Sequence, residues 1–264
     1  MKRREFLKSS LAAAGMAGVT TLLGATADKP ARELYELRLY HLRRGPRQKL
    51  FDDYLREAAI PATNRAGVGP IGVFNVMLGP DSPSLYVLIP YKSLEEFAGL
   101  DERLSADADY QKAGADFINA PATAPVYERV ESSLLVAFEG MPKLEVPAAT
   151  AEKKPRAFEL RTYESHSKKA HLKKVEMFNN GEIAIFRRAG LQPVFFGQTR
   201  IGPKQPSLTY MLVYESLAAR DKSWSAFGSD PEWRKLSTTP GYTDAEIVSN
   251  ISNLLLRPTA YSQI

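Results

Sequence analysis

The chain of 264 residues contains no cysteine, and this absence excludes several kinds of site at once. It excludes a disulfide framework, thiolate-bound zinc, an iron–sulfur cluster, a cysteine nucleophile and a lipid anchor on an N-terminal cysteine. Histidine is almost as scarce, with His41, His166 and His171 only. His166 and His171 are five residues apart, whereas metal ligands on one helix face are three or four apart. We therefore predict no metal site and no resident cofactor from the residues alone.

A large charge excess and long apolar runs are also lacking. The net charge is +5, but residues 1–27 alone carry +3, which leaves +2 for the rest of the chain. That small excess does not indicate a nucleic-acid partner. The apolar run at residues 11–24 is shorter than the roughly 20 residues that span a bilayer, so no membrane span is expected in the mature chain. The chain has no G-x-S-x-G elbow and no P-loop, and the glycines of residues 67–72 are interpreted as a turn.

The first residues have the pattern of an export signal. Arg3-Arg4-Glu5-Phe6-Leu7-Lys8 precedes the apolar run, and Ala25-Thr26-Ala27 follows it as an A-x-A cleavage site. The segment resembles the twin-arginine (Tat) signal R-R-x-F-L-K, although Lys2 stands where that family usually has serine or threonine. The resemblance implies export of a folded bacterial protein to the periplasm or the medium, with cleavage between Ala27 and Asp28. The alternatives are a signal retained as an anchor and an ordinary helix with a basic start.

The remaining chain repeats itself with an offset of 123 residues. Residues 35–40 match residues 158–163, and Arg65-Ala66-Gly67 matches Arg188-Ala189-Gly190. Across residues 35–112 there are 19 identities in 78 ungapped pairs, where average composition would give about five. A period this long indicates two homologous domains and not a solenoid. We place a signal peptide at residues 1–27, the first repeat at 28–140, a linker at 141–155 and the second repeat at 156–264.

The second repeat shows the order of elements most clearly. Residues 157–164 alternate as in a strand, and residues 168–189 have helical spacing with Gly190 as a stop signal. Further strands are expected at 193–201 and 208–215, a helix at 216–228 and a closing strand at 247–256. The order β-α-β-β-α-β is that of the ferredoxin-like fold. We predict an α+β protein in which two such repeats pack as an intramolecular dimeric α+β barrel.

With these elements in place, the chain resembles the NIPSNAP family. The resemblance is carried by residues 158–163, 185–190, 208–212 and 224–233, and the first repeat is a more diverged copy. It implies a relative of the dimeric α+β barrel proteins, which include cofactor-free monooxygenases, isomerases and haem-handling enzymes. We expect a protein that binds a small ligand or a protein partner and that can form a homo-oligomer. The alternative is a barrel-type enzyme, and haem is the cofactor that the resemblance leaves open.

The candidate ligand-binding residues lie on the duplicated first strand. Charged and aromatic residues at alternate positions share one face of each copy: Glu36, Arg38 and Tyr40 in the first repeat, and Glu159, Arg161 and Tyr163 in the second. We expect the leucines between them to face the helices and the Glu-Arg-Tyr face to look toward the partner sheet. A buried arginine needs a carboxylate or a ligand. The face is therefore interpreted either as structural pairs or as a polar cavity for a small acidic ligand.

The other prominent side chains have structural interpretations. His41 and His166 each follow a first strand and are expected to be solvated or to cap an element. Trp224 and Trp233 are expected to anchor the second helix to the sheet. Four lysines form a helix face that is expected to be solvated, with a partner-binding stripe as the alternative: Lys168, Lys169, Lys173 and Lys174. Four aromatic residues at alternating strand positions are expected in the core: Phe195, Phe196, Tyr210 and Tyr214.

Overall fold

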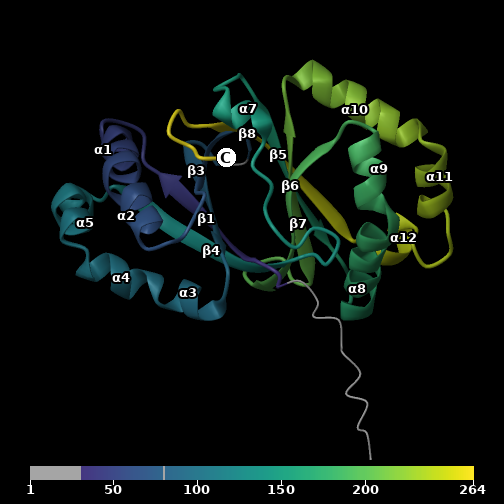
Figure 1. Ribbon diagram of the computed structural model, residues 1–264, viewed down its shortest axis with the longest axis horizontal. Helices are drawn as coiled ribbons and strands as arrows, with labels where there is room; N and C mark the ends of the chain where they lie inside the picture. Colours follow the sequence, from purple (N-terminus) through teal and green to yellow (C-terminus); the bar gives the residue numbers. More distant parts are fainter. Residues whose placement is uncertain (1–30, 80) are drawn as a thin grey trace, which may run out of the picture.

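The computed structural model describes residues 31–79 and 81–264, and it shows the two expected βαββαβ repeats (Figure 1). The predicted signal motif and cleavage site lie outside this part of the chain. The strands of the first repeat are β1 (Leu34–Leu42), β2 (Gly72–Leu78), β3 (Ser84–Tyr91) and β4 (Tyr127–Ala137). Between β1 and β2 lie α1 (Arg47–Asp53), the π-helix η1 (Tyr54–Ala59) and α2 (Ile60–Arg65). Between β3 and β4 lie α3 (Leu94–Ala98), α4 (Leu100–Ala106), α5 (Ala108–Ala113) and α6 (Ala115–Ile118).

The second repeat has the same plan. Its strands are β5 (Ala157–Glu164), β6 (Gln192–Ile201), β7 (Ser207–Tyr214) and β8 (Asn250–Pro258). The first helical layer consists of α8 (Lys168–Met177), the π-helix η2 (Phe178–Glu182) and α9 (Ile183–Arg188). The second consists of α10 (Leu217–Ser229), α11 (Pro231–Ser237) and α12 (Asp244–Ile247). The closing strand begins three residues later than expected, because Thr243 and Glu246 form a capping box that makes residues 244–247 helical.

All eight strands close into one antiparallel barrel in the order β1-β3-β2-β8-β5-β7-β6-β4. The repeats join at two places: Phe74 of β2 pairs with Pro258 of β8, and Ala137 of β4 pairs with Gly197 of β6. Each joint combines the second strand of one repeat with the fourth strand of the other, so the repeats are related by an approximate twofold axis. The helices of the two repeats lie on opposite sides of the barrel (Figure 1). Closure pairs strands that would be open edges in an isolated repeat.

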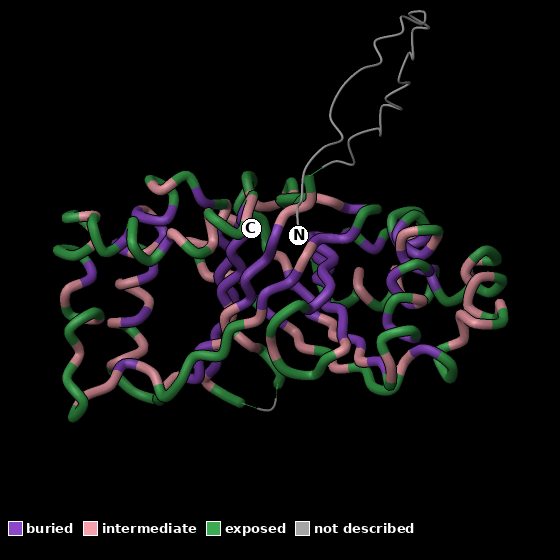
Figure 2. Tube along the Cα trace, turned by 90° about the horizontal axis from the view of Figure 1, so that it is seen from below, coloured by how far each residue is buried: buried purple, intermediate pink, exposed green. Residues whose placement is uncertain are grey.

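Four apolar clusters lie among the described residues, and the three largest form the cores of the molecule. One lies between the sheet and the helices of the first repeat, and one lies in the same place in the second. The third fills the barrel with side chains from both repeats, among them Tyr35, Phe74, Phe158 and Phe195. Buried stretches accordingly run through the strands and along one side of the helices (Figure 2). The C-terminal Ile264 is fully buried in the barrel core.

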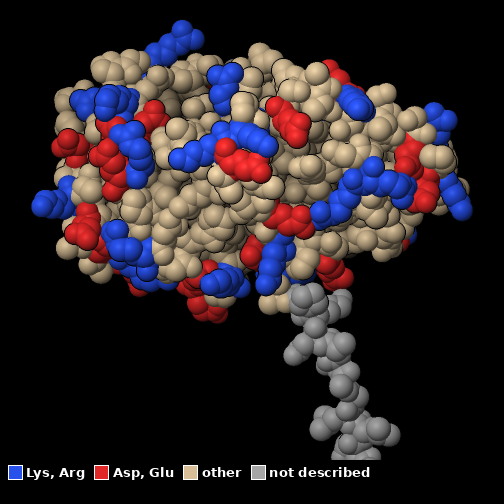
Figure 3. Space-filling view, turned by 45° about the horizontal axis from the view of Figure 1, so that its top comes forward, with Lys and Arg blue, Asp and Glu red and all other residues tan. Residues whose placement is uncertain are grey.

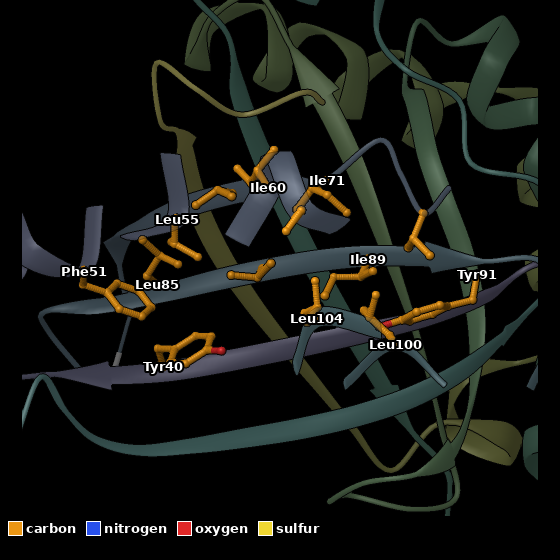
Figure 4. Close-up of a cluster of buried hydrophobic side chains, with 14 of the residues drawn as sticks. Tyr40, Phe51, Leu55, Ile60, Ile71, Leu85, Ile89, Tyr91, Leu100 and Leu104 are labelled. Atoms are coloured by element: carbon orange, nitrogen blue, oxygen red, sulfur yellow. The ribbon is translucent and has the colours of Figure 1, made fainter. Parts of the chain in front are cut away.

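The orientation expected for the duplicated strand is wrong. Leu37 and Leu160 point into the barrel core, whereas Tyr40 and Tyr163 belong to the layers under the helices. Figure 4 shows Tyr40 on β1 directed toward Phe51 of α1, on the same side as Leu85 and Ile89 of β3. The Glu-Arg-Tyr face therefore meets the helices of its own repeat. Alternation could not decide this, because both faces of a barrel strand covered by helices are buried.

The segment that we assigned as a linker connects β4 to β5 and contains one short helix, α7 (Ala148–Ala151). It contacts both repeats through its backbone: the Leu144 amide donates to Glu33 Oε2 at 2.7 Å, and the Glu145 amide donates to the Val194 carbonyl at 2.9 Å. Among the described residues, no helix is long and apolar enough to cross a membrane. On the face shown in Figure 3, basic and acidic side chains are intermingled and do not form a field of one sign.

Candidate functional site

Glu159 is the centre of the Glu-Arg-Tyr cluster in the second repeat. Its side chain is 1% exposed and accepts hydrogen bonds from four residues. The donors are Arg161 Nη1 at 3.1 Å, Tyr214 Oη at 2.9 Å, Trp224 Nε1 at 3.0 Å and Arg220 at 2.7 and 3.0 Å. Burial by itself raises the pKa of Glu159, but the Arg220 hydrogen bonds and the charge of Arg161 hold it below its usual range. The carboxylate is therefore ionised and fully used inside the protein.

Arg161 is enclosed by aromatic rings. Its Nη2 donates to Tyr163 Oη at 3.1 Å, and its guanidinium carbon lies 4.6 Å from the ring centre of Trp224. Tyr210 Oη also donates to Tyr163 Oη at 3.1 Å. The cluster thus binds β5 to α10, and the expectation that Trp224 anchors this helix to the sheet is confirmed. The alternating aromatic residues are buried as expected.

The first repeat contains a simpler version of the same cluster. Arg38 donates to Glu36 through Nε at 2.7 Å and Nη2 at 2.9 Å. Tyr91 Oη and Ser132 Oγ complete the coordination, each at 2.8 Å. Burial favours the neutral acid, yet the Arg38 hydrogen bonds lower the pKa of Glu36 below its ordinary value. The structure thus brings each Glu-Arg-Tyr set together within its own strand, and the two sets do not meet across the sheets.

Lys174 contradicts the expectation of a solvated lysine face. Its ammonium lies 3.2 Å from Glu182 Oε2, and both side chains are only 2% exposed. The ammonium also lies 5.1 Å from the Phe178 ring centre and 5.4 Å from that of Tyr163. Lys168 and Lys169 are exposed, and Lys173 is half-buried. One of the four lysines is therefore a core residue that pairs with a carboxylate supplied by the π-helix η2.

The main cavity of the protein lies in the barrel interior and was missed by the sequence analysis. It has a volume of about 490 Å³ and opens at the end of the barrel where β1 ends. Its floor consists of leucines from both repeats: Leu37, Leu39, Leu135, Leu160 and Leu254. A usable signal was present in the sequence, since Leu39 of the first copy is replaced by Thr162 in the second. The second copy therefore has a hydroxyl on the face that we expected to be an apolar contact with the helices. A polar group at that position is typical of a cavity wall and not of an apolar core.

The first repeat contributes a closed ionic network to the mouth of this cavity. His41 Nε2 lies 2.9 Å from Glu131 Oε1, and its Nδ1 lies 3.2 Å from both Asp81 Oδ2 and Arg129 Nη2. Arg129 Nε in turn donates to Glu131 Oε1 at 3.0 Å. His41 is 6% exposed, so the expectation of a solvated His41 is wrong. It is buried because strand pairing places it between β3 and β4, and Asp81 of the β2–β3 turn lies against its ring.

The second repeat contributes hydroxyl groups to the opposite wall. Thr162 Oγ1 and Thr209 Oγ1 are 3.0 Å apart, and Ser207 Oγ donates to Thr199 Oγ1 at 2.9 Å. Lys204, in the β6–β7 turn, donates to Ser252 Oγ at 3.0 Å. The two walls are therefore different, although the repeats that form them are homologous.

The remaining histidines take no part in the cavity. His166 is exposed, as expected. His171 is a buried residue of α8, and burial lowers its pKa to about 4, which keeps it neutral at physiological pH. Within residues 31–79 and 81–264, no group of three or more His, Asp or Glu side chains is arranged to hold a metal ion.

The comparisons identify the family to which this fold and cavity belong. The NIPSNAP family model matches residues 35–139 and again residues 158–263, which together make up most of the chain. The chain belongs to the NIPSNAP family, and it carries two copies of the family domain. No curated protein matches the chain.

Solved structures share the fold. A protein from Lactobacillus acidophilus NCFM, provisionally named a monooxygenase, has 8% sequence identity and a TM-score of 0.55, with 86% of this chain and 94% of that chain covered. An anthrone oxidase-like protein has 12% identity and a TM-score of 0.50, with 88% and 93% covered. An uncharacterized NIPSNAP-like domain protein from Burkholderia xenovorans has 22% identity and a TM-score of 0.37, with 40% and 88% covered. At these identities, the first two show the tandem α+β barrel architecture and do not show an activity.

Proposed function

We propose that the protein binds a small molecule with an apolar body in the cavity at the barrel mouth. The observation that carries this proposal is that large side chains fill the barrel at one end, whereas about 490 Å³ stays open at the other. That volume lies within the roughly 300–1,000 Å³ of typical small-molecule sites. An apolar ligand would bury the leucine surface at the cavity floor, which is favourable. The polar groups at the rim would fix the ligand's position.

The Glu-Arg-Tyr clusters support this choice by contrast. The cavity beside Arg38 and Tyr40 has a volume of about 40 Å³, which accommodates a water molecule and not an organic ligand. Glu36 and Glu159 already accept several internal hydrogen bonds each. These carboxylates therefore orient strands and helices, while the ligand occupies the barrel.

We favour binding over catalysis because His41 and Tyr86, at the cavity mouth, are poorly placed to act as bases. Both ring nitrogens of His41 already lie within hydrogen-bond distance of Glu131, Asp81 or Arg129, so neither is left to contact a ligand. Burial, together with the charges of Glu131 and Asp81, raises the pKa of Tyr86 to about 12. Its phenol therefore remains protonated at physiological pH and can only donate a hydrogen bond or accept one.

The test is a fluorescence titration with the neutral probe N-phenyl-1-naphthylamine. Leu39→Trp should fill part of the cavity and weaken probe binding about tenfold, because it removes apolar contact area. Leu172→Trp is the matched control, since Leu172 is exposed on α8 far from the cavity lining. The proposal fails if the folded protein does not bind the probe, or if Leu39→Trp and Leu172→Trp bind it equally well.

We also propose that the chain is exported through the Tat pathway to the periplasm or the medium. Support comes from Arg3-Arg4 followed by the A-x-A site that ends at Ala27. Changing both arginines to lysine should leave the precursor in the cytoplasm, as shown by cell fractionation and by the size of the product. Processing after Ala27 in cells without the Tat translocase would contradict this route.

A further inference from the structure

We propose that the barrel-mouth cavity takes an anionic amphipathic ligand, with a carboxylate as the simplest case, and holds its acidic head against the wall of the second repeat. This inference rests on the proposed function and adds the ligand's charge and orientation. It follows from how the two homologous walls have diverged.

The divergence is seen at equivalent positions of the two walls. Asp81 in the β2–β3 turn corresponds, at the offset of 123 residues, to Lys204 in the β6–β7 turn. Leu39 pairs with Glu131 across β1 and β4, and the equivalent pair across β5 and β8 is Thr162 with Ser252. Two carboxylates of the first wall are thus a lysine and a serine in the second. The two walls are related by an approximate twofold axis, but the first carries negative charge and the second carries a positive charge and hydroxyl groups.

The second wall offers hydrogen-bond donors that the protein does not use up. A hydroxyl carries one proton, so each hydroxyl pair spends one of its two protons internally. Ser207 donates to Thr199, and the Thr199 proton remains for a ligand; the Thr162–Thr209 pair likewise retains one. Ser207, Thr209 and Thr199 are 1%, 5% and 7% exposed and line the cavity. These fixed donors form a site for oxygen atoms that carry negative charge.

Lys204 adds a positive charge to this wall. Among the described residues, no Asp or Glu lies within ion-pair distance of its ammonium, and its one hydrogen bond goes to the neutral Ser252. The residue lies on an exposed turn and at the same time borders the cavity. An acidic head at the hydroxyl wall would therefore meet a cation without first breaking an ion pair.

The first wall is less suited to a ligand carboxylate. The basic side chains there, Arg129 and His41, already contact Glu131 and Asp81. Burial raises the pKa of Tyr86 on that side of the cavity, and the charges of Glu131 and Asp81 raise it further. A ligand carboxylate on this wall would have to compete with them. The apolar body would meanwhile lie on leucines that both repeats supply, so the orientation is set by the head group.

The experiment measures how three chain-matched compounds displace N-phenyl-1-naphthylamine: decanoate, decan-1-ol and decylammonium. We expect decanoate to displace the probe at a concentration about tenfold lower than decan-1-ol does, the value of about one hydrogen bond to a charged group. Lys204→Gln and Thr162→Val should each remove most of that preference and leave decan-1-ol binding as it was. Lys222→Gln is the matched control, because it removes an exposed lysine of α10 that does not border the cavity.

Each other outcome contradicts the inference in a distinguishable way. Equal displacement by decanoate and decan-1-ol means that the cavity binds apolar bodies without reading charge, so the proposed function stands and the inference fails. Preference for decylammonium places the head on the carboxylates of the first wall. If Arg129→Gln loses the decanoate preference and Lys204→Gln keeps it, the acidic head lies on the first wall and not on the second. If Lys222→Gln and Lys204→Gln reduce the decanoate preference equally, the preference comes from general surface charge and not from a site. Failure of the probe itself to bind removes the proposed function and the inference together.

Discussion

Lys174 and Glu182 form an ion pair at 3.2 Å in the core of the second repeat, whereas the first repeat has Phe51 and Ala59 at the equivalent positions. Two solutions to the same packing problem therefore occur within one chain. Phe51 packs on Tyr40 with ring centres 4.7 Å apart, while Lys174 lays its ammonium beside Tyr163 and Phe178. The charged version needs both partners, because an unpaired ion in this layer would lose its hydration without compensation.

Lys174→Met should destabilise the protein by about 3–5 kcal/mol, because it leaves Glu182 without its cation in the core. Urea unfolding followed by tryptophan fluorescence measures the loss. The double variant Lys174→Met/Glu182→Gln should recover most of it, since the stranded charge is then gone as well. If the double variant is as unstable as the single one, the loss comes from packing and not from the ion pair.

The same variant should be less damaging in acid. Burial raises the pKa of Glu182 in the folded protein, and removal of Lys174 raises it further, so the folded state holds a proton that the unfolded state releases. The unfolded carboxyl group is the same in both proteins, so stability relative to the wild type must fall as the pH rises above the pKa that Glu182 has in the folded wild type. Unfolding at pH 4 and pH 7 tests this sign. An equal stability difference at both values would contradict the expected change in the ionisation of Glu182.

Arg161→Lys should lower stability by about 1–3 kcal/mol and leave probe binding in the barrel unchanged. The lysine keeps the charge but cannot donate to Glu159 and Tyr163 at once through a planar fork. Thermal unfolding and the probe titration together make the measurement. Because the sequence pattern proposed Arg161 as a ligand-binding residue, a loss of ligand binding without a loss of stability would restore that hypothesis and move the site under the helices.

Asp230→Ala should lower the melting temperature, and Asp230→Asn should lower it less. Asp230 caps α11 by accepting from the amides of Glu232 at 2.8 Å and Trp233 at 3.1 Å, and it pairs with Arg188 at 2.9 Å. Burial works against the ionised form, but these bonds hold the pKa of Asp230 below its usual value. Its contribution is therefore present above the unfolded pKa and is lost as the pH falls through the folded one. The difference between Ala and wild type should shrink as the pH falls below the ordinary aspartate pKa of about 3.9, and a constant difference would contradict the assignment.

Residues 30–140 and 156–264, produced separately, should associate with themselves or with each other. Each half would expose the strands that otherwise pair β2 with β8 and β4 with β6, along with half of the barrel core. Sedimentation of each half and of their mixture provides the measurement. Two halves that remain monomeric and melt as the full chain does would show that the barrel core contributes nothing to their stability.

Arg65 and Asp107 show how closely the two repeats agree in structure where their residues are identical. They recur as Arg188 and Asp230, and both pairs form the same contact, at 2.7 and 2.9 Å. Residues identical at this offset thus form equivalent contacts, here an ion pair, because both copies fold with the same local geometry. Lys174 could not be predicted in this way: its copy is a phenylalanine, and helical spacing alone does not reveal which neighbour of three surface lysines turns inward.

The sequence by itself determined the duplication, the order of strands and helices, the barrel class and the family, since all of these follow from periodicity and from residues compared at one offset. Only the tertiary structure decided which face of β1 and β5 looks into the barrel. Leucines and the Glu-Arg-Tyr residues are both buried there, and the partners that satisfy the charges, such as Tyr91, Tyr214 and Arg220, come from elements more than 50 residues away. The cavity arises for the same reason. It is lined by residues of seven strands and two turns, and no segment of the chain contains enough of its lining to reveal it.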